Sequence, residues 1–248
     1  AARILTNDGH AGAGTGFIVA GECASQGKAF VVHLDASGAV VGASLWTVSD
    51  GGGLSPSAIT RTGSGSELVL VGEVRNAPSG DGMFVARLDD AGDLRSSHGY
   101  VACETAFNLS PTAVIAAESG GITVVGGSHA QRRSFVARIH ENGEVGFVRH
   151  PGLAGGNSPL FVASDLAELP TSGFVMAAST VELTGDGAAA VPALALVGLD
   201  AGGRPMWLKR HAPDARRAAS FGALRLTPDG GVTVTALVAG DDGAGAMW

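Results

Sequence analysis

The chain has 248 residues, of which 45% are hydrophobic and 16% are charged, and it contains 39 glycines. This length can bury a large core, and the composition is that of a globular, turn-rich chain, which excludes a disordered one. The net charge of −7 disfavours binding to nucleic acid and to anionic membranes, because both require a basic surface.

The first residues of the chain, 1–9, lack the basic, apolar and small-residue regions of a signal peptide. We therefore expect that any targeting segment has been removed. No run of 18 or more apolar residues occurs further along, so the sequence predicts no membrane insertion.

An apolar run that ends in a small residue recurs roughly every 50 to 60 residues. Its Val, Ile, Leu and Phe content and the neighbouring turn signals predict a strand in each copy. The copies are GFIVAG ending at Gly21, ELVLVG at Gly72, GITVVG at Gly126, GFVMAA at Ala178 and GVTVTA at Ala236. A small residue at this point indicates that adjacent repeat units approach closely there.

A second apolar run follows each of the first four copies and ends in a glycine turn. Weaker strands are predicted before the first run and after the second, which gives four strands per unit. The second runs are AFVVHLDASG ending at Gly38, MFVARLDDAG at Gly92, SFVARIHENG at Gly143 and ALVGLDAGG at Gly203.

Repeated four-stranded units of this length predict an all-β fold, a β-propeller of about five antiparallel blades in one domain, residues 1–248. A parallel β-helix is disfavoured because its coils are shorter, about 20 to 25 residues. The expected repeat units are approximately 1–48, 55–101, 110–150, 158–211 and 219–248.

The segments VGLDAGGRPMWLKRH, residues 197–211, and FVARLDDAG, residues 84–92, resemble the bacterial β-propeller repeat of many extracytoplasmic proteins. This resemblance implies a propeller fold and an extracytoplasmic or secreted location, but no reaction. Trp46 and Trp207 are expected to occupy core positions of the repeat.

The last unit is incomplete, because the chain ends at GAMW where its third strand begins. We assign residues 2–5 to the first strand of the first unit. Two alternatives stay open: a five-bladed ring closed by its own termini, or a segment of a longer propeller with an exposed edge.

The connections of each unit differ in kind at its two ends. The turns after the first and third strands are short and monotonous, and we call this the turn end. The connections after the second and fourth strands vary, and we call this the loop end. Variable loops on a rigid scaffold usually carry ligand contacts, so the loop end is the predicted binding face.

Two arginine pairs at the loop end could hold a phosphate, sulfate or carboxylate, although solvated surface arginines remain the alternative. Two cysteines at the same end could form a disulfide or remain thiols. The candidate ligand-binding residues are His129, Arg132, Arg133, Arg216 and Arg217, and the candidate disulfide joins Cys23 and Cys103.

Most other polar side chains are expected to have structural roles. Asp35, Asp89 and Asp200 recur beside a turn, where an Asp side chain binds turn backbone. Asp81, Asp186 and Asp242 recur before the third strand, but without Asp-x-Asp-x-Asp spacing they suit turns better than calcium. Ser55, Ser110 and Ser158 recur at the start of the first strand, and His150 and His211 recur at the end of the fourth.

The sequence contains no pattern of a metal site or nucleophile elbow, so we assign no catalytic residue, metal or cofactor. The favoured function is a non-enzymatic extracytoplasmic binding or scaffold domain with a protein or glycan partner at the loop end. A carbohydrate-binding lectin is one alternative. The other is a glycan-active propeller enzyme, with Asp165 or Glu168 as candidate carboxylates.

Overall fold

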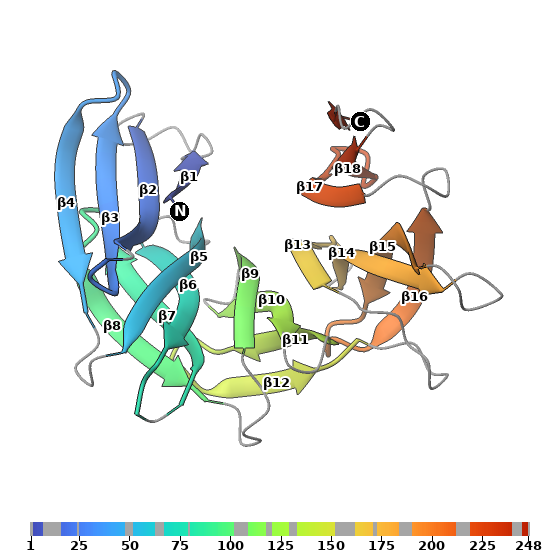
Figure 1. Ribbon diagram of the computed structural model, residues 1–248, viewed down its shortest axis with the longest axis horizontal. Coiled ribbons are helices and arrows are strands. Elements are labelled where there is room, and N and C mark those ends of the chain that lie inside the picture. Colours follow the sequence, from blue (N-terminus) through green and yellow to red (C-terminus); the bar gives the residue numbers. More distant parts are fainter. Residues whose placement is uncertain are drawn as a thin grey trace. The chain divides into compact units, whose positions relative to one another are not determined.

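A computed structural model shows that the chain is built from antiparallel sheets of consecutive strands (Figure 1). This confirms the expected all-β class and the four-stranded units. The structure describes residues 2–6, 16–23, 25–47, 52–62, 67–78, 80–101, 109–117, 121–128, 133–151, 162–170, 173–183, 190–211, 219–239 and 245–247.

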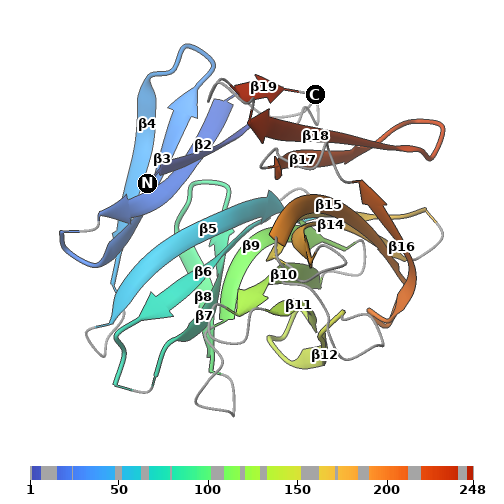
Figure 2. The same cartoon turned by 45° about the vertical axis from the view of Figure 1, so that its right-hand side comes forward.

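The first two sheets each have their strands in chain order, from the first to the fourth. Figure 2 shows the β3–β4 hairpin of the first sheet beside β2. The first contains β1 (Ala2–Thr6), β2 (Gly16–Cys23), β3 (Lys28–Asp35) and β4 (Val40–Trp46). The second contains β5 (Gly53–Arg61), β6 (Glu67–Arg75), β7 (Gly82–Asp89) and β8 (Leu94–Tyr100).

The next two sheets follow the same order. The third contains β9 (Leu109–Ala116), β10 (Ile122–Ser128), β11 (Arg133–Ile139) and β12 (Val145–Arg149). The fourth contains β13 (Val162–Glu168), β14 (Phe174–Leu183), β15 (Ala190–Leu199) and β16 (Pro205–His211).

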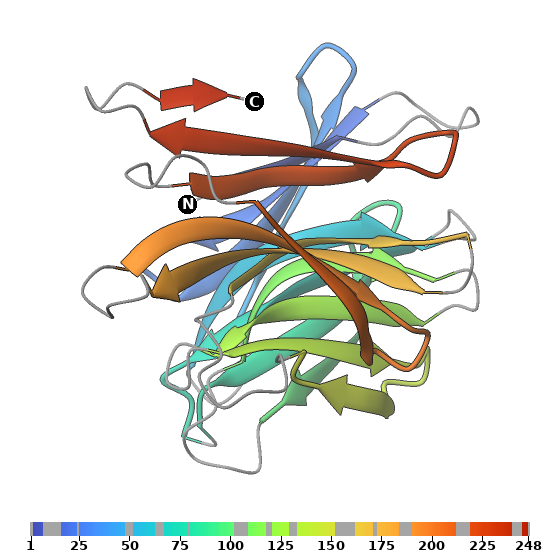
Figure 3. The ribbon, with the colours of Figure 1, turned by 90° about the vertical axis from the view of Figure 1, so that its right-hand side faces the viewer.

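The fifth sheet has three strands among the described residues, β17 (Ala219–Leu226), β18 (Val232–Ala239) and β19 (Gly245–Met247). Figure 3 shows β17 and β18 side by side at the red end of the chain. The short β19 pairs antiparallel with β18, so it is the third strand expected at the end of the sequence. At the other end of the chain, β1 pairs with β2, which confirms residues 2–5 as a first strand.

The chain divides into two compact units, residues 1–122 with 141–143 and residues 123–140 with 144–248. In the first unit, alternate side chains of the first sheet pack against the second sheet in a core that excludes water. Trp46 is partly buried against this core. The core consists of Ile18, Ala20, Ala29, Val31, Leu54, Ile59, Leu68, Leu70, Phe84, Ala86 and Leu88.

In the second unit, Val175 and Ala177 of β14 pack against Leu224 of β17, which is 1% exposed. Val232 and Val234 of β18 pack around these residues. The fourth and fifth sheets are thus joined by aliphatic side chains from alternate strand positions.

The first strands of three sheets carry a β-bulge at the same place in the repeat. The pairing with the second strand shifts between Pro56 and Ala58 in β5, between Ala163 and Asp165 in β13, and between Phe221 and Ala223 in β17. A bulge leaves backbone groups without their usual partners, and these groups determine how neighbouring sheets are joined.

The small residue expected to end the second strand lies inside β6 (Glu67–Arg75), at Gly72. A Cβ atom at Gly72 would lie 2.4 Å from the carbonyl oxygen of Ser55 and 2.5 Å from the Phe84 ring. Both neighbours belong to the same sheet, so the close approach at this glycine occurs within one sheet.

Candidate functional site

The aspartates beside the turns bind the backbone of their own turns. Asp35 Oδ1 accepts hydrogen bonds from the N–H groups of Ser37 at 2.8 Å and Ala39 at 2.9 Å. Asp200 Oδ1 accepts from Gly202 at 2.9 Å and Arg204 at 2.8 Å. Asp89 makes the equivalent pair of bonds. The expected turn role is confirmed for these three residues.

The bonds also affect ionisation. The Ser37 hydroxyl, together with the turn N–H groups, holds the pKa of Asp35 below its ordinary value. The Asp93 N–H lowers the pKa of Asp89 in the same way, with a further contribution from Arg95. These carboxylates are therefore charged, and they are bound to the backbone of their own turns.

A cluster at the loop end of the first unit is built differently, because its side chains come from three sheets. Glu22 lies near the end of β2, Glu73 and Arg75 lie at the end of β6, and Ser110 lies at the start of β9. We call these four residues the loop-end cluster.

Arg75 is the centre of the loop-end cluster. Its Nε and Nη2 atoms both lie 2.5 Å from Glu73 Oε2, and its Nη1 atom lies 3.8 Å from Glu22 Oε2. The Ser110 hydroxyl donates to Glu73 Oε1. Glu73 is thus held on both oxygens, whereas the contact of Glu22 with the guanidinium is longer.

Exposure of the loop-end cluster suits contact with a ligand. The Arg75 side chain is 48% exposed, whereas the Glu22 and Glu73 side chains are 20% and 15% exposed. Of the three charged side chains, the Arg75 guanidinium is therefore the one most open to solvent.

The sequence prediction missed this cluster, although a signal was present. Glu22 and Glu73 occupy the same repeat position, directly after the small residue, in AGEC and VGEV. The carboxylate that repeats directly after the small residue is the sequence signal for this cluster.

The predicted arginine site lies mostly outside the described residues. Arg133 is exposed at the start of β11. The other four candidates, His129, Arg132, Arg216 and Arg217, fall outside the described part of the chain, so a convergence of these residues stays a prediction.

Of the two cysteines in the predicted disulfide, the structure describes Cys23. Cys23 is half-buried at the end of β2, with its sulfur 3.8 Å from Ser25 Oγ. Cys103 lies outside the described residues, so a bridge between the two stays a prediction.

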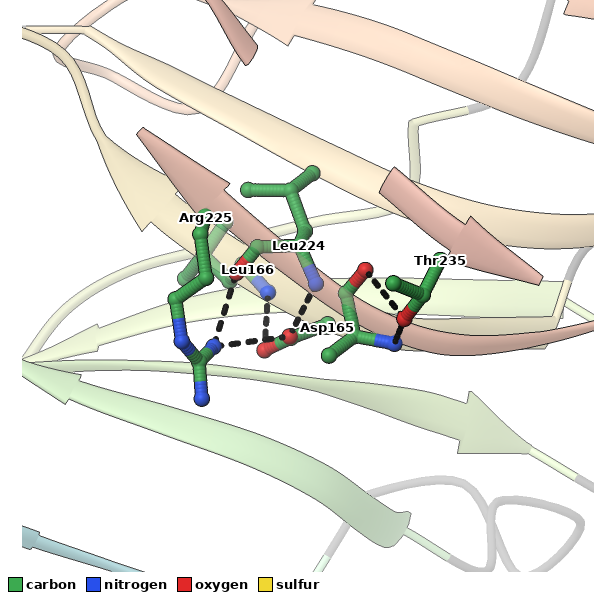
Figure 4. Close-up of polar contacts among 6 residues, drawn as sticks. Asp165, Leu166, Leu224, Arg225 and Thr235 are labelled. Atoms are coloured by element: carbon green, nitrogen blue, oxygen red, sulfur yellow. Dashed lines mark hydrogen bonds and ion pairs between the residues drawn. The ribbon is translucent and has the colours of Figure 1, made fainter. Parts of the chain in front are cut away.

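Asp165, a candidate catalytic carboxylate, joins two sheets (Figure 4). Its Oδ1 atom accepts from the Leu166 N–H at 2.9 Å, and its Oδ2 atom accepts from the Leu224 N–H at 2.7 Å. Arg225 Nη1 lies 3.4 Å from the same Oδ2 atom. Both oxygens therefore have structural partners, while Glu168 is exposed at the end of β13.

The neighbouring bulge amide in β17 is also satisfied by a side chain. The Ala223 N–H donates to Thr235 Oγ1 at 3.0 Å, and the same hydroxyl lies 3.4 Å from the Ala223 carbonyl oxygen (Figure 4). Consecutive amides at this bulge are thus bound by Thr235 within the sheet and by Asp165 from the sheet before it.

Several other expectations can be compared with the structure. Asp81 Oδ1 accepts from the Asn76 N–H at 2.6 Å, a loop-stabilising bond, whereas Asp186 and Asp242 lie outside the described residues. His150 Nδ1 lies 3.1 Å from the Ser134 carbonyl oxygen, as a structural role predicts. His211 is exposed at the end of β16.

The expectation for Trp207 was wrong. It is 37% exposed rather than in the core, because it stands on β16, the edge strand of the fourth sheet. Its ring lies over Gly198 of β15, where a Cβ atom would be 2.1 Å from the indole. Lys209 Nζ stands 5.8 Å from the centre of that ring.

Ser55 and Ser110 lie near the start of β5 and β9, as expected, and Ser158 is outside the described residues. Within the described part of the chain, no three His, Cys, Asp or Glu side chains gather as metal ligands. In the same residues, we find no helix with the length and apolar character to cross a bilayer.

No protein-family model matches the chain, and no curated protein matches its sequence. Solved structures are similar to it in fold. One is an endo-arabinase from Bacteroides thetaiotaomicron, with a TM-score of 0.54 and 9% identity over 94% of this chain and 88% of that one.

Another similar structure is the subtype N10 neuraminidase-like protein of A/little yellow-shouldered bat/Guatemala, with a TM-score of 0.56 and 9% identity over 94% and 75% of the two chains. A third is a protein of unknown function from Bacteroides caccae, with a TM-score of 0.52 and 9% identity over 95% and 69%. These likenesses support a β-propeller-like fold and, at such low identity, nothing finer.

Proposed function

We propose that the chain is a non-enzymatic binding domain of an extracytoplasmic protein, and that its loop-end cluster binds a glycan. The observation that carries the proposal is the contrast between the two ends of the sheets. At the turn end, Asp35, Asp89 and Asp200 bind their own turns. At the loop end, side chains from three sheets face one another around the half-exposed Arg75.

The chemistry of the cluster favours a ligand rich in hydroxyl groups. Carboxylates and a guanidinium group offer paired acceptors and donors that match neighbouring hydroxyls, and a few placed polar groups are what orients a ligand in such sites. The extracytoplasmic location rests on the repeat resemblance alone.

Glycan hydrolysis is the second candidate function. Glu22 and Glu73 both contact Arg75, so their carboxyl groups lie within roughly 10 Å of each other, a separation of the order used by glycosidases. The similar endo-arabinase gives this candidate a substrate class to test, although the likeness extends to the fold alone.

The test is a glycan array that includes arabinan and sialylated glycans, followed by calorimetric titration of the strongest ligand. We expect the double variant Glu22→Gln/Arg75→Gln to weaken binding at least about tenfold, because the lost hydrogen bonds involve charged groups. Arg61→Gln is the matched control, since Arg61 pairs with Asp90 at the turn end of the same sheet.

The titrated samples are then analysed for released sugars. Binding without products supports the binding domain, and products that disappear in Glu73→Gln favour the enzyme instead. An array without any bound glycan, or equal losses in the double variant and in Arg61→Gln, would show the proposal to be wrong.

A further inference from the structure

Aromatic rings of one sheet lie on the glycine turns of the next sheet. A Cβ atom at Gly92, in the β7–β8 turn, would lie 2.7 Å from His33 Nε2. At Gly143 it would lie 2.6 Å from His98 Nε2, and at Gly203 it would lie 2.6 Å from the Phe147 ring. These glycines have positive φ angles of 83°, 86° and 75°, so the turn both requires glycine and leaves room for the ring.

His33 differs from the other rings in its surroundings. Its Nε2 atom is buried and has no hydrogen-bond partner among the residues that the structure describes, which is uncommon for a polar atom inside a protein. The neutral imidazole tolerates this position, since an unprotonated ring nitrogen leaves only an acceptor unsatisfied. A proton on Nε2 would add a buried charge without an acceptor.

The charged groups around His33 come from β5 and from β7 with the turn that follows it. Arg61 stands at the end of β5, Asp89 at the end of β7, and Asp90 and Asp93 in the following turn. Asp89 and Asp90 are already engaged, with Arg95 at 2.9 Å and with Arg61 respectively. Burial, followed by the Arg61 guanidinium, lowers the pKa of His33 from 6.5, and the aspartates only partly oppose this.

The position of His33 connects this ionisation to the core of the first unit. His33 lies in β3 two residues after Val31, which is fully buried between the first two sheets. If the His33 ring left Gly92, the contact between the first and second sheets, which we call the joint, would open at its turn end. Water would then reach toward that core.

We propose that the joint between the first and second sheets is acid-sensitive, because protonation of His33 expels its ring from the glycine turn of β7–β8. This goes beyond glycan binding and does not depend on it. The fold favours the neutral ring, so the stabilisation is complete above the ordinary pKa of His. It is lost as the pH falls from about 6.5 through the lower pKa of the folded protein.

The test is hydrogen exchange of residues 16–23 and 28–35 at about pH 7.5 and about pH 5.5, corrected for intrinsic exchange. Protection in the wild type should fall by up to about tenfold over the lower pH unit, the limit for one proton. In His33→Phe it should stay constant, because Phe147 shows that a hydrocarbon ring fits on such a turn. His98→Phe is the control and should behave as the wild type.

Constant protection in the wild type, or the same acid loss in His33→Phe, would overturn the proposal. If His33→Phe fails to fold, an NMR titration of His33 in the wild type decides. A pKa below 6.5, with protection falling from about pH 6.5 and levelling off below that pKa, supports the proposal, and an unshifted or raised pKa overturns it.

Discussion

A single missing Cβ atom explains why a glycine stands at position 72 inside β6. At the place where a Cβ atom would stand, the Ser55 carbonyl oxygen of β5 and the Phe84 ring of β7 are already 2.4 Å and 2.5 Å away. Only a hydrogen can occupy the space between a backbone oxygen and a buried ring.

We expect Gly72→Ala to lower the free energy of unfolding by about 2–3 kcal/mol, because the added methyl group overpacks a site bounded by backbone. Denaturant unfolding followed by circular dichroism measures the change. Gly99→Ala is the control, since a Cβ atom at Gly99 in β8 has no neighbour within 4 Å. It should stay within about 0.5 kcal/mol of the wild type, and equal effects of the two changes would contradict this explanation.

Two strands that begin a sheet, β13 and β17, are each joined to the sheet before them by a side chain that accepts a hydrogen bond from a backbone amide near the bulge. Ser134 of β11 accepts from the Ala163 N–H at 3.1 Å, and Asp165 of β13 accepts from the Leu224 N–H at 2.7 Å. In the other bulged strands, Ala58 and Ala223 occupy the repeat position of Asp165. Among these three positions, Asp165 is therefore the acidic residue, and it joins β13 to β17.

We expect Asp165→Ala to destabilise the second unit by about 2–3 kcal/mol, because it removes a charged acceptor from partly buried N–H groups. Thermal unfolding measures the loss, and Glu168→Gln on the same strand should change it little. If Asp165→Ala left stability intact but abolished a glycan-degrading activity, the catalytic role considered from the sequence would replace this structural one.

At the scale of the whole molecule, the sequence predicted the repeated strands and turns better than the contacts that occur in only one or two of the sheets. Alternating apolar runs and glycine turns indicated the sheets and the roles of Asp35, Asp89 and Asp200, because both depend on residues adjacent in sequence. The bulges, the contacts of Asp165 and the approach of Glu22 to Arg75 depend on which sheets become neighbours. A single sequence does not encode those distances in any local pattern. The repeated position of Glu22 and Glu73 was therefore visible in the sequence, but their approach to Arg75 was not.

The turn carboxylates together predict how the whole protein responds to strong acid. The Thr227 hydroxyl lowers the pKa of Asp229, as the Ser37 hydroxyl does for Asp35 and the Asp93 N–H does for Asp89. Carboxylates with lowered pKa values stabilise the fold fully above the ordinary value of 3.8, and this contribution is lost as the pH falls through the lower folded values.

We therefore expect unfolding midpoints to drop as the pH falls below about 4, separately from the His33 effect, which begins at about pH 6.5. The triple variant Asp35→Asn/Asp89→Asn/Asp229→Asn should show a shallower drop, because Asn has no proton to take up. Glu141→Gln, which removes an exposed turn carboxylate, should follow the wild-type curve. A triple variant with the same acid slope as the wild type would mean that carboxylates elsewhere in the chain set its stability in acid.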